Sequence, residues 1–474
     1  MMMPDSGPPP PEDSGPPPPI PLSTFFNIEV AMFQTVKIKL SANGAPVSEN
    51  ATVAAGKPGI LRVYVTPATG PLYQGALKCD LELQYPSATK KTMSDDHVLS
   101  TVSKDSDLKS TFNFKLGAAD LVPDMTFKIA IYDAKRPTNV AAYPSDGTTD
   151  SLRVKGYVSD FRIQIVPVHY TANNMDLLPD LSSTQMGFYT QTVLQMYPVA
   201  NVTLMPPHAP LVWTQPISPG GTGWGELLMA VADLRAQDQP PADVYYMGSF
   251  RSMTTLSAYC NSGCILGLSP VPPANDVAGR VSLITGYFGQ QSADTLNHEL
   301  GHALGRGHAP CGGAGGVDPK FPYSGGGVGG WGYDFTADKL VDPGPLTKPI
   351  IFDFMSYCGP IWISDYTYRG LYTRISYVRQ SAGLQKSVAP PKKMHALSVA
   401  HDGSSRWMKP MENLRELPGS REEAHFLDAV GGDLGAFTAG KWELPDLGRN
   451  ALFLPEPPPN AARVRIGGRE VKLP

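Results

Sequence analysis

From residue 25 to residue 158 the chain alternates polar and apolar residues, the pattern of strands with one buried face. Turn clusters such as SANGAP separate the segments that carry this pattern, which are Val36–Leu40, Gly59–Val65, Ala76–Tyr85, Ser110–Leu116 and Thr126–Tyr132. Short strands at this spacing are typical of two packed antiparallel sheets. We therefore predict an N-terminal immunoglobulin-like β-sandwich over residues 25–158.

The pattern changes near Asp160, where apolar strands begin to alternate with helices. The predicted strands are FRIQIVPVHY, ANVTLMP, DVYYMGSF and RVSLITGYF. The predicted helices are SSTQMGFYTQTVLQMYP, WGELLMAVADLRAQ, SADTLNHELGHALG and SDYTYRGLYTRISYVRQS. Strands that alternate with helices indicate a sheet covered by helices. This part spans residues 159–388, and Pro390 and Pro391 close it.

The two ends of the chain have simpler patterns. Residues 389–474 contain short apolar runs between turns, and we predict a small β-rich module there. Residues 1–24 contain DSGPPPP twice, which predicts an extended polyproline tether. This segment has neither the basic nor the apolar stretch of a signal peptide. Either the true start lies upstream, or a leader has been removed, or the protein is cytoplasmic.

Composition narrows the class of protein. The 474 residues carry a net charge of −4, so no global positive field draws the chain to nucleic acid. No run of 18 or more apolar residues is present, so we predict no transmembrane helix. The 47 glycines and 48 prolines favour turns and β-structure over long helices. We expect a monomer.

The five cysteines indicate a cellular compartment. Cys260 and Cys264 lie in CNSGC, Cys311 and Cys358 flank the histidine-rich segment described next, and Cys79 is left over. Two pairs and one remaining thiol are typical of an exported protein with two disulfides. The alternative is five reduced thiols. Cys79 alternates with leucines, so we place it in a buried strand and not over a metal.

The strongest chemical signal is HELGHALGRGH, which begins at His298 and ends at His308. On a helix, His298 and His302 project from one face and can bind one zinc ion. Gly305 can adopt a positive φ, end the helix and bring His308 in as the third ligand. Glu299 lies beside the metal and can take a proton from a water held there. The alternative is an amphipathic helix whose histidines satisfy hydrogen bonds in the core.

The pattern HExxHxxGxxH followed by DFMSY resembles the metzincin zinc metalloproteases. The resemblance implies an α+β metzincin catalytic domain, with Met355 in a tight turn beneath the zinc ligands. It also implies that Tyr357 reaches the metal and stabilises an oxyanion, although Tyr357 could instead be a packing residue beside Cys358. The segments HAPCGG, GGWGYD and DFMSYCGPIWISDYTY are similar to secreted bacterial metzincins with N-terminal β domains. Mucin-degrading metalloproteases are the nearest relatives we can name, which implies a secreted or cell-surface protein.

Together these residues predict a zinc-dependent endopeptidase, with one catalytic Zn²⁺, that cleaves extracellular proteins or glycoproteins. The strand at Val281–Gly286 is the candidate edge for an extended substrate. One alternative is a glycoprotein-binding or surface-binding protein that keeps a non-catalytic zinc site. Another is a zinc-stabilised structural protein whose site is covered. A Gly-rich loop covers about residues 310–332. Three aspartates in or just after it are candidate Ca²⁺ ligands, although such residues more often only contact solvent; they are Asp318, Asp334 and Asp338.

Overall fold

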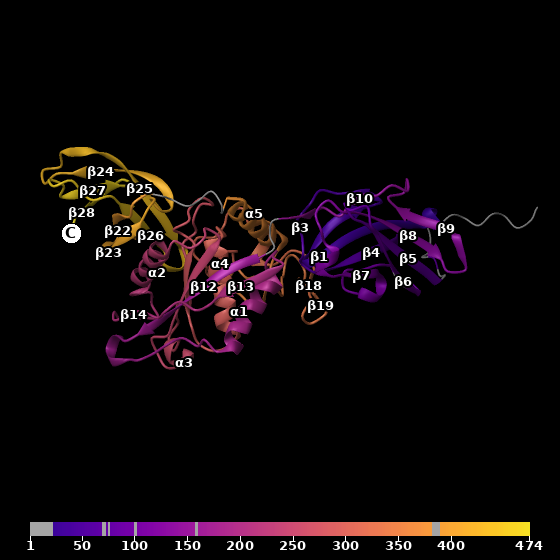
Figure 1. Ribbon diagram of the computed structural model, residues 1–474, viewed down its shortest axis with the longest axis horizontal. Helices are drawn as coiled ribbons and strands as arrows, with labels where there is room; N and C mark the ends of the chain where they lie inside the picture. The colour runs from indigo at the N-terminus through magenta and orange to yellow at the C-terminus, as the bar shows by residue number, and fades with distance from the viewer. Residues whose placement is uncertain (1–21, 69–72, 74–75, 99–101, 157–159, 382–388) are drawn as a thin grey trace, which may run out of the picture.

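The structure, a computed structural model, describes residues 22–474 except 69–72, 74–75, 99–101, 157–159 and 382–388. Residues 1–21, most of the predicted tether, lie outside the described residues. An N-terminal β part, a central α/β part and a C-terminal β part follow one another along the long axis (Figure 1). The last three residues of the predicted tether, Leu22–Thr24, form a 3-10 helix, η1, whose Leu22 is buried. The folded N-terminal part therefore includes residues before residue 25.

The N-terminal part contains two main sheets whose apolar faces form one core. The first sheet contains β1 (Phe26–Ala42), β2 (Ala45–Pro46), β4 (Gly59–Pro67) and β7 (Phe112–Leu116). The second contains β5 (Ala76–Gln84), β6 (Lys90–Val98), β8 (Thr126–Asp133), β9 (Arg136–Tyr143) and β10 (Asp150–Ser151). A separate pair joins β3 (Val53–Ala54) to β11 (Val154–Lys155). The alternation that predicted strands is visible in β8, where every second side chain is buried.

The sheet built around β1 also includes two strands from the segment of the central part that follows the Gly-rich loop. They are β18 (Gly332–Asp334) and β19 (Lys339–Val341), and β18 pairs antiparallel with β1 at Thr35 and Val36. The Trp362 indole also donates a hydrogen bond to the Thr35 carbonyl at 3.0 Å. The N-terminal and central parts are therefore joined through a shared sheet. The sequence pattern did not reveal these strands, because three residues are too few to show an alternation.

The central part is a mixed sheet with helices on both faces. Its strand order is β13-β12-β15-β17-β16, and β14 pairs with the far end of β12. The strands are β12 (Asp160–Tyr170), β13 (Asn201–Met205), β14 (Leu211–Trp213), β15 (Val244–Phe250), β16 (Gly267–Leu268) and β17 (Val281–Thr285). The helices are α1 (Ser183–Met196), α2 (Trp224–Asp238), α3 (Leu256–Tyr259), α4 (Gln290–Ala303) and α5 (Asp365–Ser381). A short parallel pair, β20 (Phe352–Asp353) and β21 (Ile361–Trp362), precedes α5.

The two faces of this sheet pack against different helices. Along β12, Ile163 and Ile165 join the core that contains α1 and α4, whereas Val166 and Val168 join the core that contains α2. Alternate residues of a strand point to opposite faces, so α1 and α4 cover one face and α2 covers the other. No helix among the described residues is long and apolar enough to cross a membrane.

The prediction that β17 is an exposed edge for substrate is wrong. β17 pairs in parallel with β15 on one side and antiparallel with β16 on the other, and all five of its residues are buried. A continuous apolar run is the pattern of a strand buried on both faces, and RVSLITGYF has that pattern. The edge is instead β16, whose two residues are too few to stand out in the sequence.

The C-terminal part is an antiparallel sheet of order β23-β22-β26-β25-β24-β27-β28. Its strands are β22 (Lys392–Ala400), β23 (Ser405–Leu414), β24 (Ser420–Leu427), β25 (Asp433–Leu444), β26 (Arg449–Leu454), β27 (Arg463–Ile466) and β28 (Arg469–Lys472). Between β25 and β26 lies a one-turn 3-10 helix, η6 (Pro445–Leu447). The remaining 3-10 helices are η2 (Leu108–Ser110), η3 (Ala118–Asp120), η4 (Ala172–Asn174) and η5 (Ser324–Gly326).

This C-terminal part is docked on α2 through a buried interface. Trp442 and Met408 share one apolar core with Trp224 of α2. The Trp442 indole donates to the buried carboxylate of Asp276 at 2.7 Å. The Asp233 carboxylate accepts hydrogen bonds from two backbone amides of the C-terminal part, at 2.7 and 2.9 Å. Residues 389–474 are thus packed onto the central part, which the sequence pattern alone did not indicate.

Candidate metal centre

Helix α4 carries the first two histidines of the motif, and its end positions the third. His298 and His302 lie on one face of α4, as their spacing predicted. Gly305 follows with φ 78°, and its amide donates to the His302 carbonyl at 2.7 Å. The Arg306 amide donates to Gly301 at 2.9 Å, which closes the helix end. This turn brings His308 back beside the helix, as the positive φ of a glycine allows.

The three imidazoles converge on one point through their Nε2 atoms. The Nε2–Nε2 distances are 3.1 Å between His298 and His302, 3.0 Å between His302 and His308, and 3.2 Å between His298 and His308. A point equidistant from three such atoms lies about 1.8 Å from each. This distance is close to the ~2.0–2.1 Å of a zinc–imidazole bond, so the three side chains could together hold a zinc ion.

The hydrogen bonds of the other ring nitrogens determine what the Nε2 atoms can do. Each Nδ1 faces a backbone carbonyl: His298 faces Phe354 at 2.7 Å, His302 faces Arg306 at 2.7 Å, and His308 faces Gly315. A carbonyl only accepts, so each Nδ1 must donate. In the neutral ring the Nε2 atom then carries the lone pair. Three lone pairs aimed at one point cannot hydrogen-bond to one another, whereas a cation between them satisfies all three.

Burial keeps the helical histidines in the ligand form. It lowers the pKa of His298 to about 4 and that of His302 to about 3, because the charged ring loses its hydration. Both rings are therefore neutral near pH 7, which is the state that coordinates metals.

Glu299 lies beside the three histidines and is 2% exposed. Burial, together with the nearby Asp446, raises the pKa of its carboxyl. Its Oε2 atom has no hydrogen-bond partner among the described residues. Gly267 of β16 makes room for it, because a Cβ at Gly267 would stand 2.2 Å from Glu299 Oε1. An unpartnered buried carboxylate oxygen beside a metal site is placed to exchange a proton with a bound water.

The segment DFMSY forms a tight turn under α4. The Met355 amide donates to the Asp353 side chain at 2.9 Å, and the Met355 carbonyl accepts from the Ala309 amide at 2.9 Å. Met355 is buried, and a Cβ added at Gly301 of α4 would stand 2.3 Å from its sulfur. The helix therefore rests directly on Met355. Tyr357 is half exposed, and its ring lies 4.8 Å from the His308 ring, measured between centroids.

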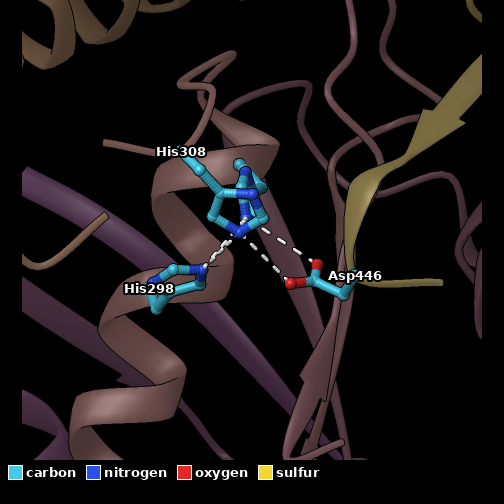
Figure 2. A group of neighbouring side chains, drawn as sticks. His298, His308 and Asp446 are labelled. Atoms are coloured by element: carbon cyan, nitrogen blue, oxygen red, sulfur yellow. Dashed lines mark hydrogen bonds and ion pairs between the residues drawn. The ribbon is translucent and has the colours of Figure 1, made fainter. Parts of the chain in front are cut away.

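A fourth residue, which no sequence pattern indicated, reaches this cluster from the C-terminal part. Asp446 of η6 points its carboxylate at the histidines (Figure 2). Its Oδ1 lies 3.3 Å from His308 Nε2, and its Oδ2 lies 3.7 Å from His302 Nε2. The Tyr357 hydroxyl donates to Oδ1 at 2.6 Å, while Oδ2 has no hydrogen-bond partner among the described residues. Asp446 follows a proline in an ordinary turn, so no local signal distinguishes it.

The electrostatics of Asp446 match its position. Burial alone would raise the pKa of its carboxyl, but the neighbouring His302, His308 and His298 lower it overall. Burial and the Asp446 carboxylate raise the pKa of the Tyr357 hydroxyl, so this hydroxyl stays protonated and donates. Two buried carboxyl groups, those of Glu299 and Asp446, therefore lie beside the three imidazoles. This donor set of nitrogen and oxygen suits a zinc ion.

The predicted cysteine pairs are confirmed. Cys260 and Cys264 form one disulfide, Cys311 and Cys358 form the other, and Cys79 is a buried free thiol. The second disulfide ties the chain just after His308 to the residue that follows Tyr357. It therefore links the two segments that contribute to the metal centre.

The candidate calcium ligands lie in separate contacts. Asp318 accepts from the Tyr366 hydroxyl at 2.8 Å, Asp334 accepts from the Thr336 amide at 2.9 Å, and Asp338 pairs with Lys115 at 2.8 Å. Within the described ranges, the only cluster of three or more histidine, cysteine or acidic residues at ligand spacing contains His298, His302, His308 and Asp446.

Comparison with known families agrees with this site. The family model described as Peptidase M66 matches residues 279–348, which include β17, α4 and the three histidines. The match and the histidine cluster support a metallopeptidase, that is, a hydrolase whose substrate is a protein. The matched span ends before Met355, Tyr357 and Asp446. No curated protein sequence matches the chain.

Proposed function

We propose that the chain is a zinc-dependent endopeptidase of the metzincin type. The observation that carries the proposal is the convergence of three Nε2 lone pairs with the unpartnered Glu299 carboxylate beside them. A structural zinc site needs ligands but has no use for a buried general base. On this proposal residues 159–388 are a metzincin catalytic domain, and residues 25–158 are an immunoglobulin-like β-sandwich.

The residues of the site divide the chemistry among them. His298, His302 and His308 would hold the zinc ion, which when bound supplies a Lewis acid that activates water and polarises a carbonyl. Glu299 accepts a proton from the attacking water and passes it to the leaving amine, as its raised pKa permits. Tyr357 donates from its hydroxyl to the oxygen on which negative charge develops. Met355 supports α4 from below and fixes the histidines in place.

We further propose that the substrates are extracellular proteins or glycoproteins and that the protein is secreted or held at a cell surface. The two disulfides support this location, since such bonds persist in oxidising compartments. The segments similar to mucin-degrading metalloproteases support glycoproteins as candidate substrates. A glycoprotein-binding protein with a non-catalytic zinc site is the alternative in which the β parts carry the function.

One observation favours a second candidate, a structural zinc site. Asp446 closes the cluster to four protein side chains, the number typical of structural zinc. The zinc would then fasten the C-terminal part to the central part. This candidate leaves the buried Glu299 carboxylate and the room that Gly267 makes for it without a purpose.

The test is cleavage of a peptide library and of a mucin by protein that holds one zinc per chain. Wild type and Asp446→Ala are each compared with the same protein carrying Glu299→Ala. We expect Glu299→Ala to lower activity by about 10²–10⁴-fold in whichever background is active, the usual contribution of a general base. Equal activity with and without Glu299 would show that the protein is not this enzyme, and so would a lack of activity in both backgrounds and also after the chain is cut beside Asp446.

A further inference from the structure

The segment that carries Asp446 lies against the histidines of the candidate active site. The Glu443 carbonyl accepts a hydrogen bond from the Val271 amide at 3.1 Å, just beyond the edge strand β16. Pro445 then packs on Gly316, because a Cβ added to Gly316 would stand 2.9 Å from the Cβ of Pro445. On the other side Leu447 packs on Gly221, where an added Cβ would stand 2.8 Å from Cδ2 of Leu447. The turn therefore spans the site and is held by contacts on both flanks.

The position of this turn is the one a substrate would need. In the proposed enzyme an extended peptide must lie along the open edge of the sheet, which is β16, and must place a carbonyl oxygen near the three histidines. Asp446 puts a carboxylate oxygen within 3.3 Å of His308 Nε2, and η6 lies against β16. The same carboxylate accepts a hydrogen bond from the Tyr357 hydroxyl, which in the proposed enzyme would otherwise donate to the oxyanion. A substrate and η6 cannot occupy the site together.

We propose that Asp446 is the fourth metal ligand and that η6 occupies the substrate position, so that the full chain is a closed, latent form of the enzyme. The latency rests on the proposed peptidase function, whereas the ligand role of Asp446 does not. A carboxylate binds zinc at about 2.0–2.2 Å and fills the position that a catalytic site leaves to water. The unpartnered Oδ2 of Asp446 supports this role, because a buried charged oxygen needs a cation or a donor.

The packing of the C-terminal part determines how the site can open. β25 and β26, which flank η6, contribute Trp442 and Phe453 to the apolar core shared with α2. The Asp276 carboxylate, which is also buried, accepts from the Trp442 indole and from the Gly419 amide. Small movements of η6 are therefore resisted by an interface that is already packed. Exposure of the site requires η6 to move away from the histidines, which either loss of the Asp446 contacts or a cut in the β25–β26 hairpin would favour.

The first experiment measures the ligand role without any peptidase assay. Zinc affinity of Asp446→Ala is determined by competition with a chelator, and the visible absorption spectrum of its cobalt-substituted form is recorded. Glu443→Ala is the matched control, because Glu443 is an exposed carboxylate on the same hairpin. Removal of a residue that only supports a metal ligand typically weakens metal binding about 10–100-fold. We expect the loss of zinc affinity in Asp446→Ala to be at least as large, because Asp446 is proposed to bind the metal directly. We also expect its cobalt spectrum to change, and both properties of Glu443→Ala to match wild type.

An unchanged zinc affinity and an unchanged cobalt spectrum in Asp446→Ala would overturn the ligand role. Asp446→Asn is measured in parallel, because it keeps the size of the side chain and loses the charge. If Asp446→Ala does not fold, the same two readouts on Asp446→Asn decide the matter.

The second experiment tests latency on the same proteins. Peptide-library cleavage is compared among wild type, Asp446→Ala and wild type that carries a specific protease site between Gly448 and Arg449, before and after cutting. We expect activity to rise at least about tenfold in Asp446→Ala or after the cut, and to depend on Glu299. Activity of wild type equal to that of both opened forms would overturn latency while leaving a working peptidase. No activity in any form would instead count against the peptidase itself, and the zinc affinities would still decide the role of Asp446.

Discussion

The Cys311–Cys358 disulfide offers a quantitative test of how the metal centre is held together. It joins residues 47 apart in sequence, whereas Cys260–Cys264 joins residues 4 apart. In the chain-entropy description, closing loops of these lengths stabilises the folded state by about 4 and about 2 kcal/mol, respectively. Replacing both cysteines by serine should therefore lower the free energy of unfolding about twice as much at the first pair as at the second.

The structure adds a second expectation, which concerns the metal. The Tyr357 amide donates to the Cys311 carbonyl at 3.3 Å, and Ala309, next to His308, donates to Met355. Loss of the Cys311–Cys358 bond loosens both segments of the site, so zinc affinity should fall together with stability. The Cys260–Cys264 bond lies in a loop before β16 and makes no such link. Its removal should leave zinc affinity within about threefold of wild type, which corresponds to less than 1 kcal/mol.

The assay is urea unfolding of the metal-free proteins, followed by chelator competition on the folded ones. Metal is left out of the unfolding step because a bound ligand stabilises the folded state by mass action. Cysteine-to-serine variants are used in place of reducing agent, so that each bond is tested separately. Equal losses of stability in the two double variants, or equal losses of zinc affinity, would refute the reasoning.

Two further predictions concern single residues. Lys57 is buried, which lowers its pKa from 10.5 to about 7, and its ammonium donates to the Leu194 carbonyl at 2.6 Å. Between pH 7 and pH 10.5, Lys57 is therefore more protonated in the unfolded chain than in the folded chain. The free energy of unfolding should consequently rise by about 2 kcal/mol from pH 7 to pH 9. Urea unfolding of Lys57→Met across this range should show a flatter dependence, and an equally steep one would contradict the assignment. Gly267→Ala would push the Glu299 carboxylate from its place; we expect kcat/KM to fall at least about tenfold with one zinc still bound per chain, measured by peptide cleavage and metal analysis in the active background.

Local patterns were sufficient to predict the helix and its histidines. A spacing of four residues places His298 and His302 on one face whatever surrounds the helix, and Gly305 marks the turn that returns His308. The five strand segments predicted in the N-terminal part also lie within or largely within β1, β4, β5, β7 and β8. Alternation over several residues is a property of the segment itself, so it can be read without knowledge of the partner strand.

The features that sequence reasoning missed all depend on contacts between distant segments. The edge strand β16 has only two residues and can be recognised as a strand only through its pairing with β17. β18 becomes a strand because the β1 edge offers it free backbone groups at Thr35 and Val36. Asp446 is ordinary in its own turn and reaches the histidines only because the C-terminal part docks on α2. Pairing and docking are set by surface complementarity, which a single sequence does not display.

The metal centre is therefore built from all three parts of the chain. From the N-terminal sheet, the Thr35 carbonyl holds the Trp362 indole, and the Trp362 carbonyl accepts from the Phe354 amide at 2.7 Å. The Phe354 carbonyl in turn orients His298, so a path of hydrogen bonds runs from β1 to the first ligand. From the opposite end, η6 delivers Asp446 to the same cluster. The N-terminal part thus supports the ligand geometry, whereas the C-terminal part restricts access to it. A change in the docking of the C-terminal part can consequently alter access to the site while the three histidines keep their positions.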